Sequence, residues 1–73
     1  MQTSCVWVDG ITDSMSESGL SEYFNRHGKV LSTRIDRMTG RGLVFFESSE
    51  QAQRAVSAMK GTQIKDKWIQ VRF

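Results

Sequence analysis

The most constraining feature of this sequence is the order in which two hydrophobic periods alternate along the chain. Val6 and Val8 alternate with polar or aromatic neighbours, which is the period of a β-strand with two different faces. Leu20, Tyr23 and Phe24 then recur at spacings of three and four, the period of a helix with one apolar stripe. Alternation typical of a strand occurs in two further segments, which precede a second apolar stripe with helical spacing. It occurs once more after that stripe. This order predicts strand, helix, strand, strand, helix, strand.

Capping residues indicate where these elements begin and end. Residues 12–16 are rich in Ser, Thr and Asp and offer an N-cap to the first helix, which Gly28 is expected to end. Ser48 and Gln51 have the spacing of a capping box, in which each side chain bonds the backbone amide of the other, and Gly61 is expected to end that helix. The expected strands are about Cys5–Asp9, Lys29–Arg37, Arg41–Glu47 and Trp68–Phe73, and the expected helices are about Ser16–His27 and the segment from Ser48 to Gly61, with Ile64 in a short connection.

Two interleaved right-handed β-α-β units with this order predict an α+β fold, the ferredoxin-like β-α-β-β-α-β sandwich. Its four-stranded antiparallel sheet has the first and third strands in the middle and is backed by two helices on one face. Strand alternation then sorts the side chains. The expected inward residues are Val6, Val8, Val30, Ile35, Val44, Phe46, Ile69, Val71 and Phe73. The expected outward residues are Trp7, Asp9, Arg34, Asp36, Arg41, Leu43, Phe45, Gln70 and Arg72.

Length and composition exclude several classes of protein. The 73 residues allow one small domain, and the net charge of +2 is weak evidence for a polyanionic partner. The longest unbroken apolar run, Leu43–Phe46, is far shorter than the roughly 20 residues of a membrane-spanning helix. A single cysteine, Cys5, cannot form an internal disulfide or a multi-cysteine zinc site, which indicates a reducing compartment.

The sequence contains no constellation that would support catalysis. His27 stands alone beside Gly28, where a basic group suits a helix end better than a metal. Cys5 has no neighbour in the sequence that would activate its thiol. We therefore expect no enzyme, no catalytic residue, no metal ligand and no cofactor.

The outward-facing residues point instead to a binding surface. Trp7 and Phe45 lie on the two central strands beside three arginines. An aromatic side chain left in water forgoes roughly 1.5–3 kcal/mol of burial. Nucleic-acid bases stack on such rings for about 1–3 kcal/mol each, and arginines beside them bind phosphates. The alternative is that a tail or a neighbouring domain covers the rings, since exposed apolar patches also mark protein contacts.

Two segments carry a resemblance to the RNA recognition motif. Residues 6–11, Val-Trp-Val-Asp-Gly-Ile, resemble the hexapeptide of its first strand, with Trp7 at the aromatic position. Residues 39–46 fill the octapeptide of its third strand, but Arg41 and Leu43 stand where that motif usually has aromatics. The resemblance covers essentially the whole chain. It implies RNA binding by the open side of the sheet, with moderate affinity for a single module.

Residues 5–10, 36–40 and 43–46 are similar to the later RNA recognition motifs of the Split ends (Spen) family, which share the short turn and the missing aromatics. That family consists of large nuclear regulators that bind RNA, including long noncoding RNA, and recruit transcriptional corepressors. The resemblance implies that residues 1–73 are one motif of a larger nuclear protein of transcription or RNA processing. Its implied partners are RNA, adjacent motifs and corepressor proteins, with no membrane, and the isolated module is expected to be monomeric.

The residues expected to bind RNA share the open side of the sheet. Aromatic and apolar side chains would stack on bases, arginines would bind phosphates or base edges, and the glutamine would position a base. They are Trp7, Asp9, Arg34, Arg41, Leu43, Phe45, Trp68, Gln70 and Arg72. Of these, Trp68 either borders the core or extends the open surface beside Trp7.

Two further alternatives stay open at this point. Asp9 would repel phosphates, so it either accepts a hydrogen bond from a base edge or pairs with Arg34 or Arg41. The rival function is protein docking, through the open side of the sheet or through the Tyr23 and Arg26 side of the first helix. The sequence favours neither single-stranded nor hairpin RNA.

Overall fold

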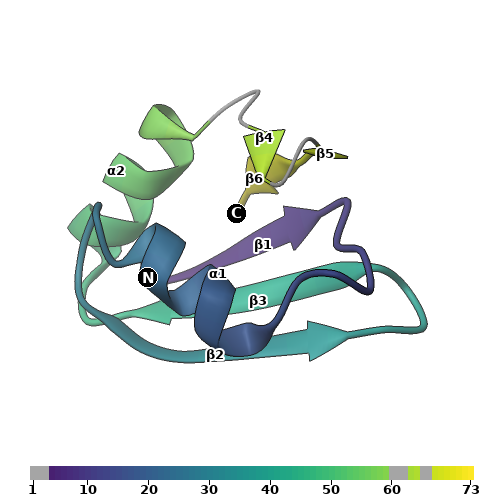
Figure 1. Cartoon of the computed structure of the whole chain (residues 1–73). Helices are drawn as coiled ribbons and strands as arrows, with labels where there is room; N and C mark the ends of the chain where they lie inside the picture. Colours follow the sequence, from purple (N-terminus) through teal and green to yellow (C-terminus); the bar gives the residue numbers. More distant parts are fainter. Residues whose placement is uncertain (1–3, 60–62, 65–66) are drawn as a thin grey trace.

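The predicted element order is present in the computed structural model, which describes residues 4–59, 63–64 and 67–73 (Figure 1). A short pair of strands is added near the end of the chain. The elements are β1 (Cys5–Asp9), α1 (Glu17–Phe24), β2 (Val30–Asp36), β3 (Arg41–Phe46), α2 (Ser49–Ala58), β4 (Gln63–Ile64), β5 (Lys67–Trp68) and β6 (Gln70–Arg72). The α+β, ferredoxin-like fold is therefore confirmed.

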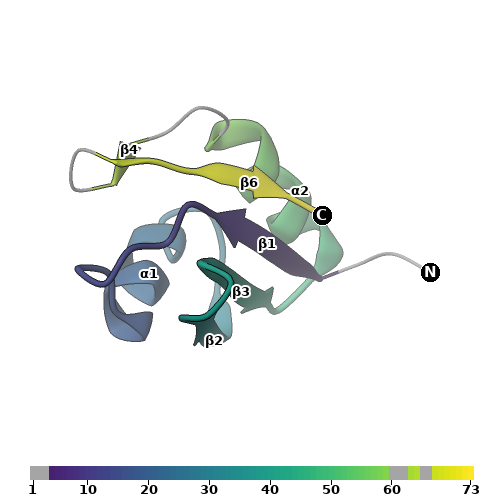
Figure 2. The same cartoon turned by 90° about the vertical axis from the view of Figure 1, so that its right-hand side faces the viewer.

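Four of these strands form one sheet in the order β2-β3-β1-β6, with every neighbouring pair antiparallel. The strands β1 and β3 lie in the middle, as predicted (Figure 1). Helix α1 packs on β2 and β3, and α2 packs on β1, β3 and β6. Figure 2 shows β6 and β1 side by side, with β2 and β3 foreshortened below them. Neither helix of the described residues packs on the opposite side of the sheet.

The core fills the space between the sheet and the two helices. Phe24 of α1 and Phe46 of β3 meet there edge to face, with ring centroids 6.3 Å apart. The buried apolar residues are Val6, Val8, Ile11, Met15, Leu20, Phe24, Val44, Phe46, Ala52, Ala55, Met59, Ile69 and Val71. In the part of the chain that the structure describes, neither helix is long and apolar enough to cross a membrane.

The edge strand β2 is irregular between Val30 and Ser32, where its pairing with β3 shifts. Leu31 lies within this irregularity and is 60% exposed. The shift explains why Val30 and Thr33 both face the helices although strict alternation would separate residues three apart. Beyond the shift, Thr33 lies opposite the buried Val44 and regular alternation resumes.

The first helix ends earlier than the sequence predicts. It ends at Phe24 with Asn25 as its C-cap, so the prediction that Gly28 ends it was wrong. Asn25 Oδ1 accepts a hydrogen bond from the amide of Val30 at 3.2 Å, which turns the chain into β2. Gly28 instead lies against α2, because a Cβ there would be 2.5 Å from Cβ of Gln51.

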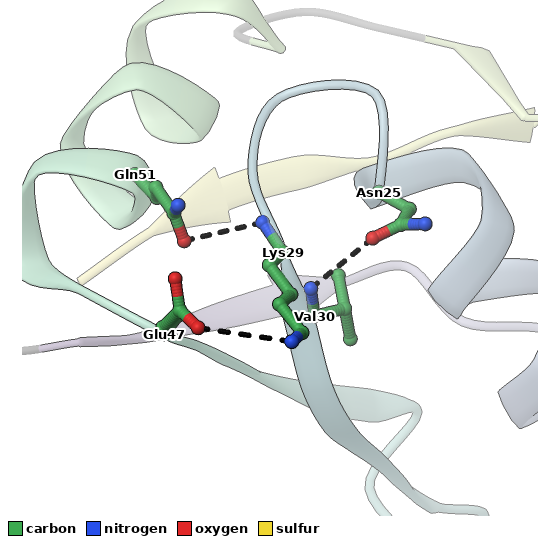
Figure 3. A network of polar contacts seen from close by, with 5 residues as sticks. All are labelled: Asn25, Lys29, Val30, Glu47 and Gln51. Carbon is green, nitrogen blue, oxygen red and sulfur yellow. Dashed lines mark hydrogen bonds and ion pairs between the residues drawn. The ribbon is translucent and has the colours of Figure 1, made fainter.

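Both helices begin with a serine cap, but the predicted capping box at the second is only half formed. Ser48 Oγ accepts from the amide of Gln51 at 3.3 Å. The Gln51 side chain does not return to Ser48: its Oε1 accepts from the amide of Lys29 at 3.1 Å (Figure 3). Lys29 Nζ also lies 3.8 Å from Glu47 Oε2. The hydrogen bond from the amide of Lys29, just before β2, to the Gln51 side chain on α2 thus replaces the expected bond between Gln51 and the amide of Ser48.

The C-terminal segment differs most from the prediction. The expected strand Trp68–Phe73 is interrupted, and only β6, Gln70–Arg72, joins the main sheet. Phe73, expected to face inward, is 52% exposed because it follows the last residue paired with β1. Ile64 belongs to β4, which pairs with β5 in a separate two-stranded sheet, and not to an unpaired connection. The expected helix end at Gly61 lies outside the described residues.

Candidate nucleic-acid interface

A row of four side chains crosses the centre of the sheet on the side away from the helices. Trp7 on β1 lies opposite Leu43 on β3 and Arg72 on β6, and Leu43 lies opposite Arg34 on β2. Residues directly opposite one another point to the same face, so these side chains are neighbours. Trp7 is 40% exposed although it lies on a central strand. We call this set the Trp7 row.

A second row lies two residues further along each strand. Asp9 lies opposite Arg41 and Gln70, and Arg41 also lies opposite Asp36. Two ion pairs meet at Asp9: Arg41 Nε is 3.1 Å from its Oδ1, and Arg72 Nε is 3.0 Å from its Oδ2. One carboxylate therefore links guanidinium groups from the strands on either side of β1. We call this set the Asp9 row.

The third row is centred on Phe45, which is half-buried opposite Cys5 and Ser32. Cys5 and Ser32 are not among the residues that the sequence predicts for the site. The signal for Cys5 was present, since it is two residues before Trp7 and shares its strand parity. Ser32 shares the parity of Arg34, but alternation counted from the inward Val30 places it on the other face, because the register shift lies between Val30 and Ser32. The three rows together form what we call the open face.

The ion pairs of Asp9 differ from the predicted ones in one respect. Pairing with Arg41 is present, whereas the structure gives Asp9 no contact with Arg34. The reason is the strand order, in which β3 separates the β2 residue Arg34 from β1. The partner that the sequence did not predict is Arg72, which donates from Nε to Asp9 Oδ2 across a separation of 63 residues.

The arginines of the open face keep part of their binding capacity. The side chains of Arg41 and Arg72 are 51% and 53% exposed, and both meet Asp9 through Nε. Their terminal Nη groups contact no acceptor among the described residues. A guanidinium held by Nε presents its other donors in a fixed plane, which suits phosphate or a base edge.

Trp68 is 67% exposed, so it does not border the core. It lies on β5, which pairs with β4, two residues before Gln70, where the pairing of β6 with β1 begins. The next residue, Ile69, is buried at 2% exposure, so alternation gives Trp68 the parity of Gln70. Its contribution to binding stays a prediction.

The other candidate residues considered in the sequence lie outside the open face. Arg26 lies over the ring of Tyr23, 5.1 Å from its centroid, so these two side chains on α1 contact each other. Within residues 4–59, 63–64 and 67–73, no group of three or more His, Cys, Asp or Glu side chains has an arrangement suited to a metal ion. What distinguishes the open face is Trp7, which is exposed on a central strand with Arg72 opposite it.

Comparison with known proteins gives relatives of two kinds. The chain is 42% identical over its whole length to Protein split ends of Drosophila melanogaster, and 40% identical to Msx2-interacting protein of Mus musculus. It spans only 1% and 2% of the lengths of these relatives. It is also 37% identical, again over the whole chain, to Glycine-rich RNA-binding protein 3, mitochondrial, of Arabidopsis thaliana, of which it spans 26%.

The family comparison agrees with the architecture. The family model described as RNA recognition motif matches residues 6–70, from the second residue of β1 to the first residue of β6. This range includes both central strands with the exposed Trp7, and both helices. The chain therefore belongs to the RNA recognition motif family.

Proposed function

We propose that this chain is a non-catalytic module that binds RNA through the open face. The observation that carries the proposal is the exposure of Trp7 in the middle of the sheet, with Leu43 on one side and Arg72 on the other. A large apolar ring flanked by an aliphatic and a cationic side chain suits a stacked base followed by a phosphate. Membership of the RNA recognition motif family supports the same conclusion.

The binding energy would come from a few contacts. Stacking of a base on Trp7 contributes about 1–3 kcal/mol, and Phe45 can support a second base less well because it is half-buried. Arg41 and Leu43 occupy positions where an aromatic ring would add further stacking. We therefore propose moderate affinity for a single module, with neighbouring modules of the same protein adding avidity.

The biological setting is also a proposal. The similarity to Protein split ends and Msx2-interacting protein supports a role in a nuclear regulator of transcription or RNA processing. Because the chain spans 1–2% of those relatives, we propose that it is one module of a larger protein. Corepressor proteins and adjacent RNA recognition motifs are the proposed protein partners of such a molecule.

The proposal is tested by titrating isotope-labelled protein with short single-stranded RNA and, separately, with hairpin RNA. We expect NMR shift changes centred on Trp7, Leu43 and Arg72, with the better ligand showing which RNA form is preferred. Trp7→Ala should weaken binding by about tenfold or more, and Trp7→Phe should restore part of it, because the ring is what stacks.

Arg72→Ala should also weaken binding, and its matched control is Arg54→Ala. Arg54 is an exposed arginine on α2, which packs on the other side of the sheet. If neither RNA shifts any resonance at low salt, RNA binding by this module is wrong. The open face would then have to dock a protein, and Trp7→Ala should disrupt a contact that salt barely affects.

A further inference from the structure

The carboxylate of Asp9 lies on the central strand β1, at one end of the open face. An acidic group there repels RNA phosphates unless it makes a favourable contact of its own with the RNA. Its oxygens are engaged differently. Oδ2 accepts a hydrogen bond from Arg72 Nε at 3.0 Å. Oδ1 lies 3.1 Å from Arg41 Nε but accepts no hydrogen bond from the described residues, and it is inaccessible to solvent. The negative charge of the carboxylate is compensated by two arginines, whereas Oδ1 accepts no hydrogen bond.

A buried oxygen without a hydrogen bond, such as Asp9 Oδ1, is stabilised by a ligand that donates an N–H group to it. Arg41 is the group beside it, and Arg41 is half exposed. Exposed ion pairs contribute little to stability, so the guanidinium can leave Oδ1 for a ligand at small cost. A ligand could replace the ion pair between Arg41 and Asp9 if it donated a hydrogen bond to Oδ1 and accepted one from the released Arg41 guanidinium.

The geometry limits where such a ligand lies. Asp9 is two residues beyond Trp7 on the same strand and the same face, roughly 7 Å away. A base stacked on the Trp7 ring can therefore direct its edge toward the carboxylate. Arg41 and Arg72 flank that edge on the two neighbouring strands.

Guanine fits this set of groups better than the other bases. It has two adjacent donors, N1–H and N2–H, which match the two acceptor oxygens of a carboxylate. Its O6 and N7 acceptors match the donors of an arginine side chain. Adenine and cytosine each present an amino donor beside a ring-nitrogen acceptor. Uracil presents one donor between two carbonyl oxygens, which a carboxylate repels.

We propose that Asp9 is a specificity-determining residue, which selects an unpaired guanine stacked on Trp7, with Arg41 moving from Oδ1 to the base or to a phosphate. This inference rests on the proposed RNA binding by the open face. It goes further in two respects. It assigns the preference for guanine to the carboxylate of Asp9, and it predicts that Arg41 leaves Asp9 to bind the RNA.

The experiment measures the affinity of the whole chain for short oligouridine that carries one variable central nucleotide. The variable nucleotide is guanosine, inosine, adenosine, cytidine or uridine. Inosine is guanosine without the 2-amino group, so it removes one of the two donors and leaves the acceptors. We expect guanosine to bind most tightly, with inosine and the other nucleotides weaker by about tenfold.

The variant that tests the assignment is Asp9→Asn, which keeps the shape and one acceptor oxygen. It should bind guanosine and inosine equally, while affinity for oligouridine stays the same or rises because two arginines are released. The matched control is Asp36→Asn, with the same change of charge in the same row. Asp36 Oδ1 accepts from the amide of Met38, which an asparagine oxygen can also do. It should keep the preference for guanosine.

The outcomes separate this inference from the proposed function. If the chain binds all five RNAs equally, guanine selection is wrong while RNA binding stands. The same holds if Asp9→Asn, shown to be folded by its NMR spectrum, keeps the wild-type preference. If no RNA binds at low salt, the proposed function is wrong and the inference falls with it.

Discussion

At the scale of single residues, Gly10 and Gly40 both have a positive φ, at 93° and 70°, but their surroundings differ. A Cβ at Gly10 would lie 2.8 Å from the carbonyl oxygen of Trp68 and 3.4 Å from Cα of Ile69. A Cβ at Gly40 would meet only the carbonyl oxygen of Ile11, at 3.4 Å. Alanine at Gly40 therefore adds backbone strain alone, whereas alanine at Gly10 adds strain and a backbone collision.

We expect Gly40→Ala to lower the free energy of unfolding by about 1 kcal/mol. Gly10→Ala should lower it by about 2 kcal/mol or more, because the segment that carries Trp68 must also move. Urea unfolding followed by tryptophan fluorescence measures both values. Equal losses for the two variants would mean that the contact between Gly10 and the Trp68 carbonyl does not constrain the chain.

Sequence predicts the open face well where a residue's role follows from strand parity. Trp7, Leu43 and Phe45 lie on the predicted face because alternation along β1 and β3 is regular. The ion pair between Arg72 and Asp9 could not be predicted, since it depends on the register of strands whose residues are 63 positions apart. Registers of that kind come from packing of the whole sheet, which no local pattern contains.

At the scale of elements, Arg37 joins two loops that lie far apart in the sequence. It follows β2, and its Nη1 and Nη2 atoms donate to the carbonyl oxygens of Thr12 at 3.0 Å and Met15 at 2.7 Å. The amide of Ile11 donates to the carbonyl oxygen of Gly40 nearby, at 2.9 Å. The loop between β1 and α1 is thus bound to the turn between β2 and β3.

We expect Arg37→Lys to destabilise the fold by about 1–2 kcal/mol, because a lysine cannot reach both carbonyl groups with a planar fork. Amide hydrogen exchange should accelerate most in residues 12–16. Arg54→Lys on the exposed side of α2 is the matched control and should change neither quantity. If Arg37→Lys left amide hydrogen exchange in residues 12–16 unchanged, the hydrogen bonds of Arg37 would not be what holds this loop in place.

Element boundaries were predicted where local chemistry decides them and missed where tertiary contacts do. Ser16 caps α1 by accepting from the amide of Gly19 at 3.0 Å, which the loop composition indicated. The Gln51 side chain was expected at its own helix cap, but the amide of Lys29 competes for it. The pairing of β4 with β5 was missed because strands of two residues leave almost no periodic signal.

At the scale of the whole molecule, the sheet separates the buried core from the proposed binding surface. The buried apolar residues lie between the sheet and the helices, while the Trp7 and Asp9 rows lie on the other side. Side chains of the open face can therefore change with little effect on the core. This separation allows two modules with the same fold to differ in what they bind.

The charge balance of the open face sets the expected response to salt. Three arginines, Arg34, Arg41 and Arg72, share this face with Asp9 and Asp36. Each phosphate neutralised on a single strand contributes about −0.7 to the slope of log affinity against log salt concentration. Three phosphate contacts give a slope of about −2, or roughly a 16-fold loss of affinity between about 50 and 200 mM salt.

Variants of single residues show which cations produce that slope. Arg72→Ala should make the slope shallower by about 0.7, and Arg54→Ala should leave it unchanged. Trp7→Phe should weaken binding at every salt concentration without changing the slope, because stacking releases no counterions. Fluorescence anisotropy with labelled single-stranded RNA measures all of these values. A slope that Arg72→Ala leaves unaltered would mean that no phosphate contacts Arg72, and the proposed role of this arginine in RNA binding would be wrong.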